Sequence, residues 1–246
     1  MTELTGKAAL VTGGSRGIGA AIAKRLARDG ADVALTYLSA DAAAHAVATE
    51  IETMGRRSLA IAADSADPEA VAAAVDRAAA VFGRLDILVN NAGIFPFGPL
   101  DDVPLAEVDR TLAIHARAAF VAAQAAARHM EAGGRIISIG SSLAERVPYP
   151  GASLYAMSKS ALTGLTKGLA RDLGKRGITV NLVHPGSTDT DMNPADGPAA
   201  DEERSFTALG RYGRPEDIAA TVAHLAGAGG ANITGTSIFV DGGATA

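Results

Sequence analysis

Short apolar runs alternate with longer amphipathic segments along the whole chain. The runs with the length and composition of buried strands span 8–11, 32–37, 58–62, 87–90, 135–139, 179–183 and 237–240. Between them lie alanine-rich segments whose charges recur at helical spacing, such as PEAVAAAVDRAAAVFG. Strands that alternate with helices are joined by right-handed crossovers, so they lie parallel in a sheet with helices on both faces. The pattern therefore predicts an α/β fold with a doubly wound sheet of about seven parallel strands.

No repeat and no linker divides the chain, so we expect one domain over residues 1–246. One irregular stretch, STDTDMNPADGPAADEERSF, begins at Ser187 and contains few apolar residues. A long loop in a compact domain is usually either a functional lid or a disordered segment. We expect a mobile substrate lid over about 187–212, with plain disorder as the alternative.

Tyr155 and Lys159 stand four residues apart in a predicted helix, so both side chains lie on one face. A free tyrosine has a pKa of about 10, and a nearby lysine cation should lower it by favouring the phenolate. Ser142 follows the predicted strand 135–139 and precedes Tyr155 by thirteen residues, which favours it over Ser141. Because ligands of open α/β sheets bind at the carboxyl ends of the strands, the trio predicts proton transfer at a carbonyl or alcohol oxygen. The alternative is a half-buried tyrosine beside a solvated lysine.

A glycine-rich turn joins the first predicted strand to the first predicted helix. Its sequence, TGGSRGIG, places Gly13, Gly17 and Gly19 in a G-x-x-x-G-x-G pattern. Glycines allow a tight turn and let the backbone approach a pyrophosphate at the helix N-terminus. A strand-to-helix turn without a ligand can also need glycine, so the motif alone leaves both interpretations open. Together with Tyr155 and Lys159 it favours a hydride-carrying dinucleotide.

The order and spacing of these motifs resemble the classical short-chain dehydrogenase/reductase family. NNAG at 90–93 and HPG at 184–186 extend the resemblance over nearly the whole chain. It implies a single Rossmann-type domain that transfers hydride between a nicotinamide cofactor and a carbonyl or secondary alcohol. By resemblance, Tyr155 is the general acid or base, Ser142 binds the substrate oxygen, and Lys159 holds the nicotinamide ribose and lowers the tyrosine pKa.

The end of the second predicted strand bears on the choice of cofactor. NAD-binding proteins of this fold carry an acidic residue there, where this chain has Tyr37. Arg16 can contact a 2′-phosphate, although a solvated arginine is the alternative and a second arginine, common in NADP-specific members, is replaced by Leu38. We therefore expect NADP, with NADPH preferred over NADH.

The resemblance further suggests contacts for the adenine, the ribose and the nicotinamide. Asp64 would accept a hydrogen bond from the adenine amino group, with a helix cap as the alternative, a role that suits Asp67 better. Thr188 or Thr190 would bind the carboxamide. The expected cofactor-binding residues are Gly13, Ser15, Arg16, Gly17, Ile18, Gly19, Tyr37, Asp64, Ser65, Asn91, Ala92, Gly93, Tyr155, Lys159, Pro185, Gly186, Thr188 and Thr190.

One candidate catalytic position departs from the family pattern. Members usually have asparagine in a sequence like I-N-x-x-x-x-F, where this chain has His115 in AIHARAAF. The asparagine bends its helix so that a backbone carbonyl holds a water linking the lysine to solvent. His115 either relays protons near neutral pH or is a tolerated change with a packed, hydrogen-bonded ring. The other histidines lack metal-ligand spacing, so we expect no metal site.

Composition excludes several classes of function. A net charge of −5 and a pI near 5.5 argue against nucleic-acid binding. The absence of cysteine excludes disulfides and thiolate catalysis. No signal peptide and no apolar run of about 20 residues is present, so we expect a cytoplasmic protein without a membrane partner.

The distribution of charge bears on the class of substrate. A 3-oxoacyl-acyl-carrier-protein reductase must bind an acidic protein, and Arg176 lies in a suitable place. The predicted lid, however, is acidic at Asp189, Asp191, Asp196, Asp201, Glu202 and Glu203. We therefore favour a reductase of small neutral ketones, with the acyl-carrier role as one alternative and a non-catalytic NADP-binding sensor or scaffold as another. The family resemblance also implies a homotetramer, for which Leu162, Leu165 and Leu169 fit either an interface or a buried core.

Overall fold

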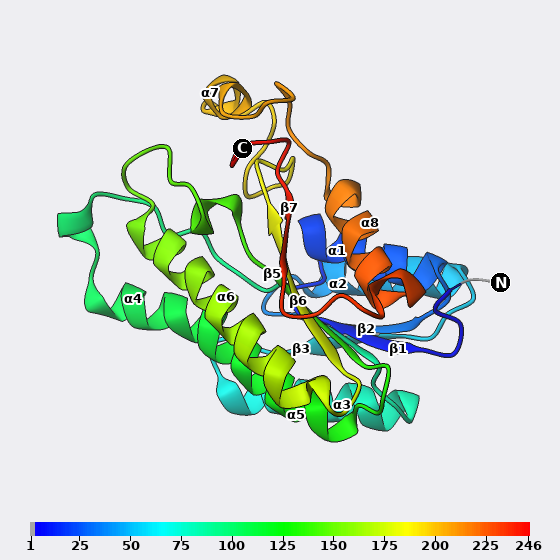
Figure 1. Cartoon of the computed structure of the whole chain (residues 1–246). Helices are drawn as coiled ribbons and strands as arrows, with labels where there is room; N and C mark the ends of the chain where they lie inside the picture. Colours follow the sequence, from blue (N-terminus) through cyan, green and yellow to red (C-terminus); the bar gives the residue numbers. More distant parts are fainter. Residues whose placement is uncertain (1–2) are drawn as a thin grey trace.

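The computed structural model describes residues 3–246, which fold around one seven-stranded sheet (Figure 1). The strands are β1 (Ala8–Val11), β2 (Asp32–Tyr37), β3 (Ser58–Ala62), β4 (Ile87–Asn90), β5 (Arg135–Ile139), β6 (Thr179–Pro185) and β7 (Ser237–Val240). Every neighbouring pair is parallel, in the order β3-β2-β1-β4-β5-β6-β7. The predicted α/β fold is confirmed, and the strands differ from expectation only in that β6 continues to Pro185.

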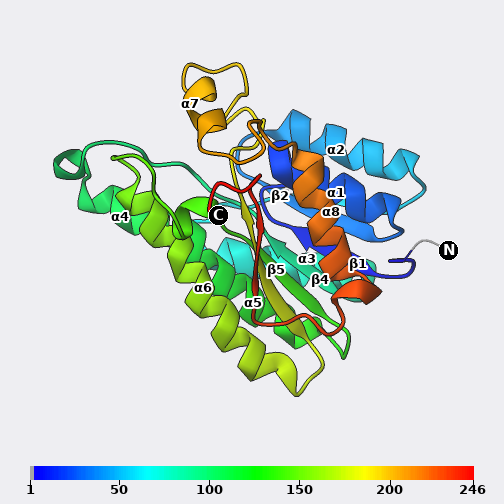
Figure 2. The same cartoon turned by 45° about the horizontal axis from the view of Figure 1, so that its top comes forward.

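Helices cover both faces of this sheet, as Figure 2 shows. The helices are α1 (Gly17–Arg28), α2 (Asp41–Thr53), α3 (Pro68–Phe82), α4 (Leu105–Leu112), α5 (Ala118–His129), α6 (Ser153–Gly174), α7 (Ala200–Ser205) and α8 (Pro215–Ala226). One apolar core packs α1, α2 and α8 on one face, and a second packs α3, α5 and part of α6 on the other. Central strands are therefore buried on both faces, which explains why their sequences are mostly apolar.

Local sequence signals fix where helices begin and end. The Asp67 carboxylate accepts hydrogen bonds from the backbone nitrogens of Glu69 at 2.9 Å and Ala70 at 3.3 Å, and Pro68 occupies the first turn. Gly83 ends α3 in the left-handed conformation, at φ +78°. An N-terminal cap such as Asp67 stabilises a helix by about 1 kcal/mol. Asp67 is therefore the helix cap that the sequence indicated.

The apolar face of α6 belongs to the core of the chain itself. Leu162 is 2% exposed and packs with Ala119 and Leu182. Leu165 and Leu169 are partly buried against the same protein interior. Leu162 is therefore a core residue, whereas half-buried Leu165 and Leu169 fit both interpretations.

The segment 187–212, expected to be irregular, contains some regular secondary structure. It contains α7, and a bridge pairs Thr188 with Gly213. The Tyr212 hydroxyl lies 3.1 Å from both the Asn193 side-chain oxygen and a Glu203 carboxylate oxygen. Asn193 also donates to Glu203 at 2.7 Å. This part of the chain stands beyond one end of the sheet in both views (Figure 1, Figure 2), fastened to itself by these bonds.

Within residues 3–246, no helix combines the length and the apolar character that crossing a membrane requires.

Candidate functional site

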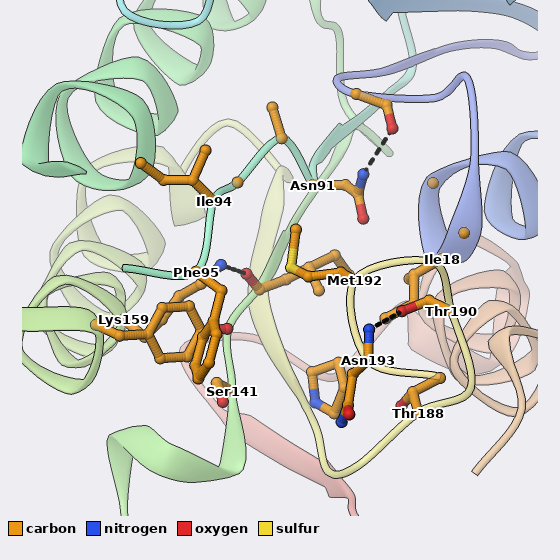
Figure 3. Close-up of a pocket in the computed structure, with 18 of the residues that line it drawn as sticks. Ile18, Asn91, Ile94, Phe95, Ser141, Lys159, Thr188, Thr190, Met192 and Asn193 are labelled. Atoms are coloured by element: carbon orange, nitrogen blue, oxygen red, sulfur yellow. Dashed lines mark hydrogen bonds between the residues drawn. The ribbon is translucent and has the colours of Figure 1, made fainter. Parts of the chain in front are cut away.

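A pocket of about 500 Å³ opens at the carboxyl ends of the central strands. Its volume is in the usual range for a cofactor or ligand site. Every residue expected to contact the cofactor lines this pocket, from the glycine-rich turn to Thr190. Figure 3 shows Phe95, Ser141 and Lys159 on one side of the space and Thr188 and Thr190 on the other.

The glycine-rich turn leaves a bare backbone surface at one end of the pocket. Gly13 has φ +63°, and a Cβ there would lie 2.9 Å from the Cα of Ala92. A Cβ on Gly19 would lie 2.2 Å from the carbonyl oxygen of Gly13. The Asn91 side chain donates to the carbonyl oxygens of Thr12 and Gly13, both at 3.0 Å. Asn91 therefore holds the turn in shape, and α1 begins directly after it, which suits a pyrophosphate.

Tyr155 and Lys159 face the same space from the first turns of α6. The Lys159 ammonium lies 5.8 Å from the centroid of the Tyr155 ring and donates to the Ile139 carbonyl oxygen at 3.0 Å. Burial lowers the pKa of Lys159 to about 8 and raises the pKa of Tyr155 to about 12. The expectation that the lysine lowers the tyrosine pKa is wrong for this structure, because loss of water around the phenolate dominates.

The hydroxyl beside Tyr155 belongs to Ser141 and not to the expected Ser142. A hydrogen bond from the Ser141 side chain favours the phenolate and opposes the effect of burial on the Tyr155 pKa. The Ser141 hydroxyl also accepts from the Leu143 backbone nitrogen at 3.2 Å and so caps the short 3₁₀ turn η3 (Ser142–Ala144). Ser142 lines the pocket without being the residue that hydrogen-bonds with Tyr155. Spacing favoured Ser142, whereas in the structure the turn after β5 brings the Ser141 hydroxyl to the tyrosine.

His115 lies in a π-helical turn, η2 (Ala113–Arg117), between α4 and α5. Its Nε2 accepts from the Ile94 backbone nitrogen at 3.0 Å, and its Nδ1 lies 2.7 Å from the Ser158 hydroxyl. Ser158 in turn donates to the Tyr155 carbonyl oxygen at 2.7 Å. Nδ1 is therefore the protonated nitrogen of a neutral ring.

Burial, together with the charge of Lys159, lowers the pKa of His115 to about 3. An imidazole that stays neutral down to that pH does not take up protons near neutrality. Both of its nitrogens are also held in fixed hydrogen bonds. The structure therefore favours the packed, hydrogen-bonded ring over a proton relay at this position.

The far end of the pocket carries the expected adenosine contacts. Arg16 is exposed and its guanidinium lies 3.9 Å from the Asp191 carboxylate of the segment after β6. Tyr37 donates its hydroxyl to Asp41, which raises the pKa of Tyr37. Asp64 accepts from the Ala66 backbone nitrogen at 2.8 Å and so shapes its own turn. This end of the pocket thus holds an exposed arginine, Arg16, and no acidic residue at the end of β2.

Sequence reasoning missed a group of aromatic side chains at the other end. Phe95, Tyr149 and Phe206 line the pocket around Tyr155. They come from three loops with no shared motif, so only their rarity in a chain with 4% aromatic residues could have drawn attention to them. Residues 3–246 contain no group of three or more histidine or acidic side chains that could hold a metal ion.

Comparisons with known proteins agree with this geometry. A family model described as enoyl-(acyl carrier protein) reductase matches residues 13–245. The cyclic-di-GMP-binding biofilm dispersal mediator protein of Escherichia coli (strain K12) is 46% identical, over 98% of this chain and 98% of its own length.

Two solved structures are closer in sequence. A short-chain dehydrogenase from Burkholderia cenocepacia J2315 in complex with NADP is 64% identical, with a TM-score of 0.98 over 99% of this chain and 100% of its own. A blue fluorescent protein from a metagenomic library, in complex with NADPH, is 58% identical, with the same TM-score and coverage. Fold, motifs and relatives together place this chain in the classical short-chain dehydrogenase/reductase family.

Proposed function

We propose that this chain uses NADPH to reduce small neutral ketones, or NADP to oxidise the corresponding alcohols, with Tyr155 as the general acid or base. The observation that carries the proposal is the convergence of Tyr155, Ser141 and Lys159 on the pocket that also contains the glycine-rich turn. The bare backbone at Gly13 and Gly19 fits a pyrophosphate, since a Cβ at either position would collide with neighbouring backbone. NADPH, when bound, supplies the hydride that adds to the carbonyl carbon.

The side chains of this chain handle the substrate oxygen. With a pKa of about 12, Tyr155 carries its proton at neutral pH and can donate it to the oxygen as negative charge develops there. The Ser141 hydroxyl holds the same oxygen and stabilises that charge, and Lys159 adds a positive charge nearby. A protonated tyrosine suits reduction, whereas oxidation of an alcohol needs the phenolate and becomes easier as the pH rises.

Cofactor preference follows from the end of the pocket near β2. Arg16 supplies a cation for a 2′-phosphate, and the expected acidic residue is replaced by Tyr37. Two relatives described above were solved with NADP or NADPH. NADP(H) is therefore the cofactor of this oxidoreductase.

Two observations favour a neutral ketone over an acyl-carrier-protein substrate. Arg176, the basic residue best placed to bind an acidic carrier, donates to the carbonyl oxygens of Ala127 at 2.6 Å and Met130 at 3.0 Å. It thus closes the end of α5. The segment 187–212, which we propose as the substrate lid, contains six acidic residues and only two basic ones, Arg204 and Arg211, so it carries net negative charge toward a partner although Asp201 pairs with Arg204.

A non-catalytic sensor is the second candidate function. It is favoured by the E. coli relative whose name records cyclic-di-GMP binding. A sensor does not need a serine, a tyrosine and a lysine around one oxygen site, which favours the enzyme. Titration of the protein with cyclic-di-GMP, with and without NADPH, separates the two functions.

The decisive experiment measures NADPH oxidation over a panel of neutral ketones and one 3-oxoacyl thioester, with Tyr155→Phe beside the wild type. We expect ketone turnover that falls by at least about a thousandfold in the variant while NADPH still binds. Turnover confined to the thioester supports the acyl-carrier alternative. NADPH binding without turnover on any substrate, together with cyclic-di-GMP binding, would replace the proposed function by the sensor.

We also propose a homotetramer, as the family resemblance implies. Size-exclusion chromatography with light scattering tests it, and a monomer at micromolar concentration contradicts it.

A further inference from the structure

Half of the aromatic residues in the chain, the proposed general acid Tyr155 among them, form one group. The chain has six phenylalanines and four tyrosines and no tryptophan. Phe95 packs edge-on against Tyr155 with ring centroids 4.8 Å apart, and stacks on Phe97 at 5.9 Å. Phe97 contacts Tyr149 at 6.1 Å, and Tyr149 contacts Phe206 at 6.1 Å. These five residues, Phe95, Phe97, Tyr149, Tyr155 and Phe206, form a continuous group that we call the aromatic rim.

The aromatic rim is not part of the apolar core. Phe95, which lines the pocket, is 39% exposed, its neighbour Phe97 is 61% exposed, and Met192, which also lines the pocket, is 55% exposed. Large apolar side chains that gather at the mouth of a pocket usually mark a binding site. The rim therefore has the character of a surface that a ligand covers.

The rim is held in place before any ligand binds. Its members come from the loop after β4, the loop before α6, the start of α6 and the end of α7. The Gly98 backbone nitrogen donates to the Gly151 carbonyl oxygen at 3.1 Å, which ties the first two loops together. Gly151 has φ +93°, and a Cβ there would lie 3.0 Å from the Phe97 ring. Glycine at position 151 therefore leaves room for the Phe97 ring.

We infer that the substrate carries a planar aromatic ring next to its carbonyl group, as in an aryl ketone. This inference rests on the proposed function, because it places the carbonyl oxygen at Tyr155. From that position, a ring bonded to the carbonyl carbon reaches the face or edge of Phe95, which is in contact with Tyr155. Aromatic rings favour such edge-to-face or offset contacts over contacts with saturated rings of the same size. A small dialkyl ketone leaves most of the rim exposed to water.

The test compares kcat/KM for acetophenone, cyclohexyl methyl ketone and butan-2-one with NADPH. We expect acetophenone to exceed the saturated ring ketone, which has nearly the same size, by about tenfold. Phe95→Leu should bring this ratio toward one, by lowering the acetophenone value more than the other. Phe120→Leu, at an exposed phenylalanine of α5 that does not line the pocket, is the matched control and should leave the ratio unchanged.

A ratio near one in the wild type, or a ratio that persists in Phe95→Leu, overturns the inference. A binding measurement separates this outcome from failure of the proposed function. Each ketone is titrated into the NADPH-loaded Tyr155→Phe variant, and the change in NADPH fluorescence reports binding. If no ketone is reduced but acetophenone binds at least tenfold more tightly than the cyclohexyl ketone, the proposed function fails and the aromatic specificity stands. Equal affinities in that measurement reject the aromatic specificity, whatever the reaction.

Discussion

The imidazole Nδ1 of His184 lies 3.0 Å from the backbone nitrogen and 2.7 Å from the carbonyl oxygen of Ser141. The ring is 2% exposed, and its own element, β6, neighbours the strand that ends just before Ser141. Gly140 makes room for it, since a Cβ there would lie 2.5 Å from Nδ1. His184 therefore anchors the backbone of the serine whose hydroxyl meets Tyr155.

His184→Ala should lower kcat by about a hundredfold with little change in the KM for NADPH, because a small displacement of Ser141 weakens its contact with the substrate oxygen. His184→Asn keeps a polar group at this place and should recover part of the loss. Phe239 stacks on His184 at 4.8 Å, so Phe239→Leu removes packing without removing the hydrogen bond. Steady-state kinetics that show the same loss in His184→Ala and Phe239→Leu would reduce the role of His184 to packing.

Separate replacement of Ser141 and Ser142 tests which hydroxyl binds the substrate oxygen. The structure favours Ser141, and the spacing to Tyr155 favours Ser142. Ser141→Ala should lower kcat by about 10²–10³-fold, the usual loss on removal of a donor to a developing oxyanion. Ser142→Ala should stay within a few-fold of wild type. The opposite ranking, with both variants folded to the same melting temperature, would restore Ser142 as the catalytic hydroxyl.

His115 should make the protein sensitive to acid. Its pKa is about 3 in the folded chain and about 6.5 when unfolded, so between these values the unfolded state binds more protons. The contribution of the neutral His115 ring to the free energy of unfolding is complete above about pH 6.5 and is lost as the pH falls toward 3. From pH 7 to pH 5 this amounts to about 2 kcal/mol of unfolding free energy.

His115→Asn should remove this part of the pH dependence and leave turnover within a few-fold. Urea unfolding of both proteins at pH 7 and pH 5 measures the difference. Burial lowers the pKa of His184 too, so part of the acid sensitivity remains in both proteins. His224→Asn, on the exposed side of α8, serves as the control. An unchanged pH dependence in His115→Asn would contradict the buried, neutral ring, and complete loss of turnover would contradict a tolerated change.

Arg16 and Asp191 should set the preference between the two nicotinamide cofactors. Arg16→Ser should raise the KM for NADPH by about tenfold and leave that for NADH nearly unchanged, since only NADPH carries the 2′-phosphate. Asp191→Asn removes a carboxylate that lies 3.9 Å from this guanidinium and should lower the KM for NADPH slightly, because exposed ion pairs are weak. Equal effects of Arg16→Ser on both cofactors would place Arg16 elsewhere than at the 2′-phosphate.

The sheet could be predicted from sequence because its central strands are buried and their sequences are short, mostly apolar runs between helical segments. The glycine-rich turn and the Tyr155–Lys159 pair were accessible for a similar reason, since local backbone geometry fixes their spacing. The serine that contacts Tyr155 could not be predicted in this way. The shape of the turn after β5, which the residue count does not reveal, brings Ser141 to the tyrosine. Nor could the raised pKa of Tyr155 be predicted, because it reflects burial by distant segments that meet only in the folded chain.

The segment after β6 forms a wall of both ends of the pocket. Near one end its Asp191 lies beside Arg16, and near the other its Phe206 contacts Tyr149. Hydrogen bonds among Asn193, Glu203 and Tyr212 join the stretch between these two contacts to itself. A shift that admits one ligand therefore alters the wall facing the other. If cofactor binding displaces this wall, thermodynamic linkage requires that cofactor and substrate change one another's affinity by the same factor.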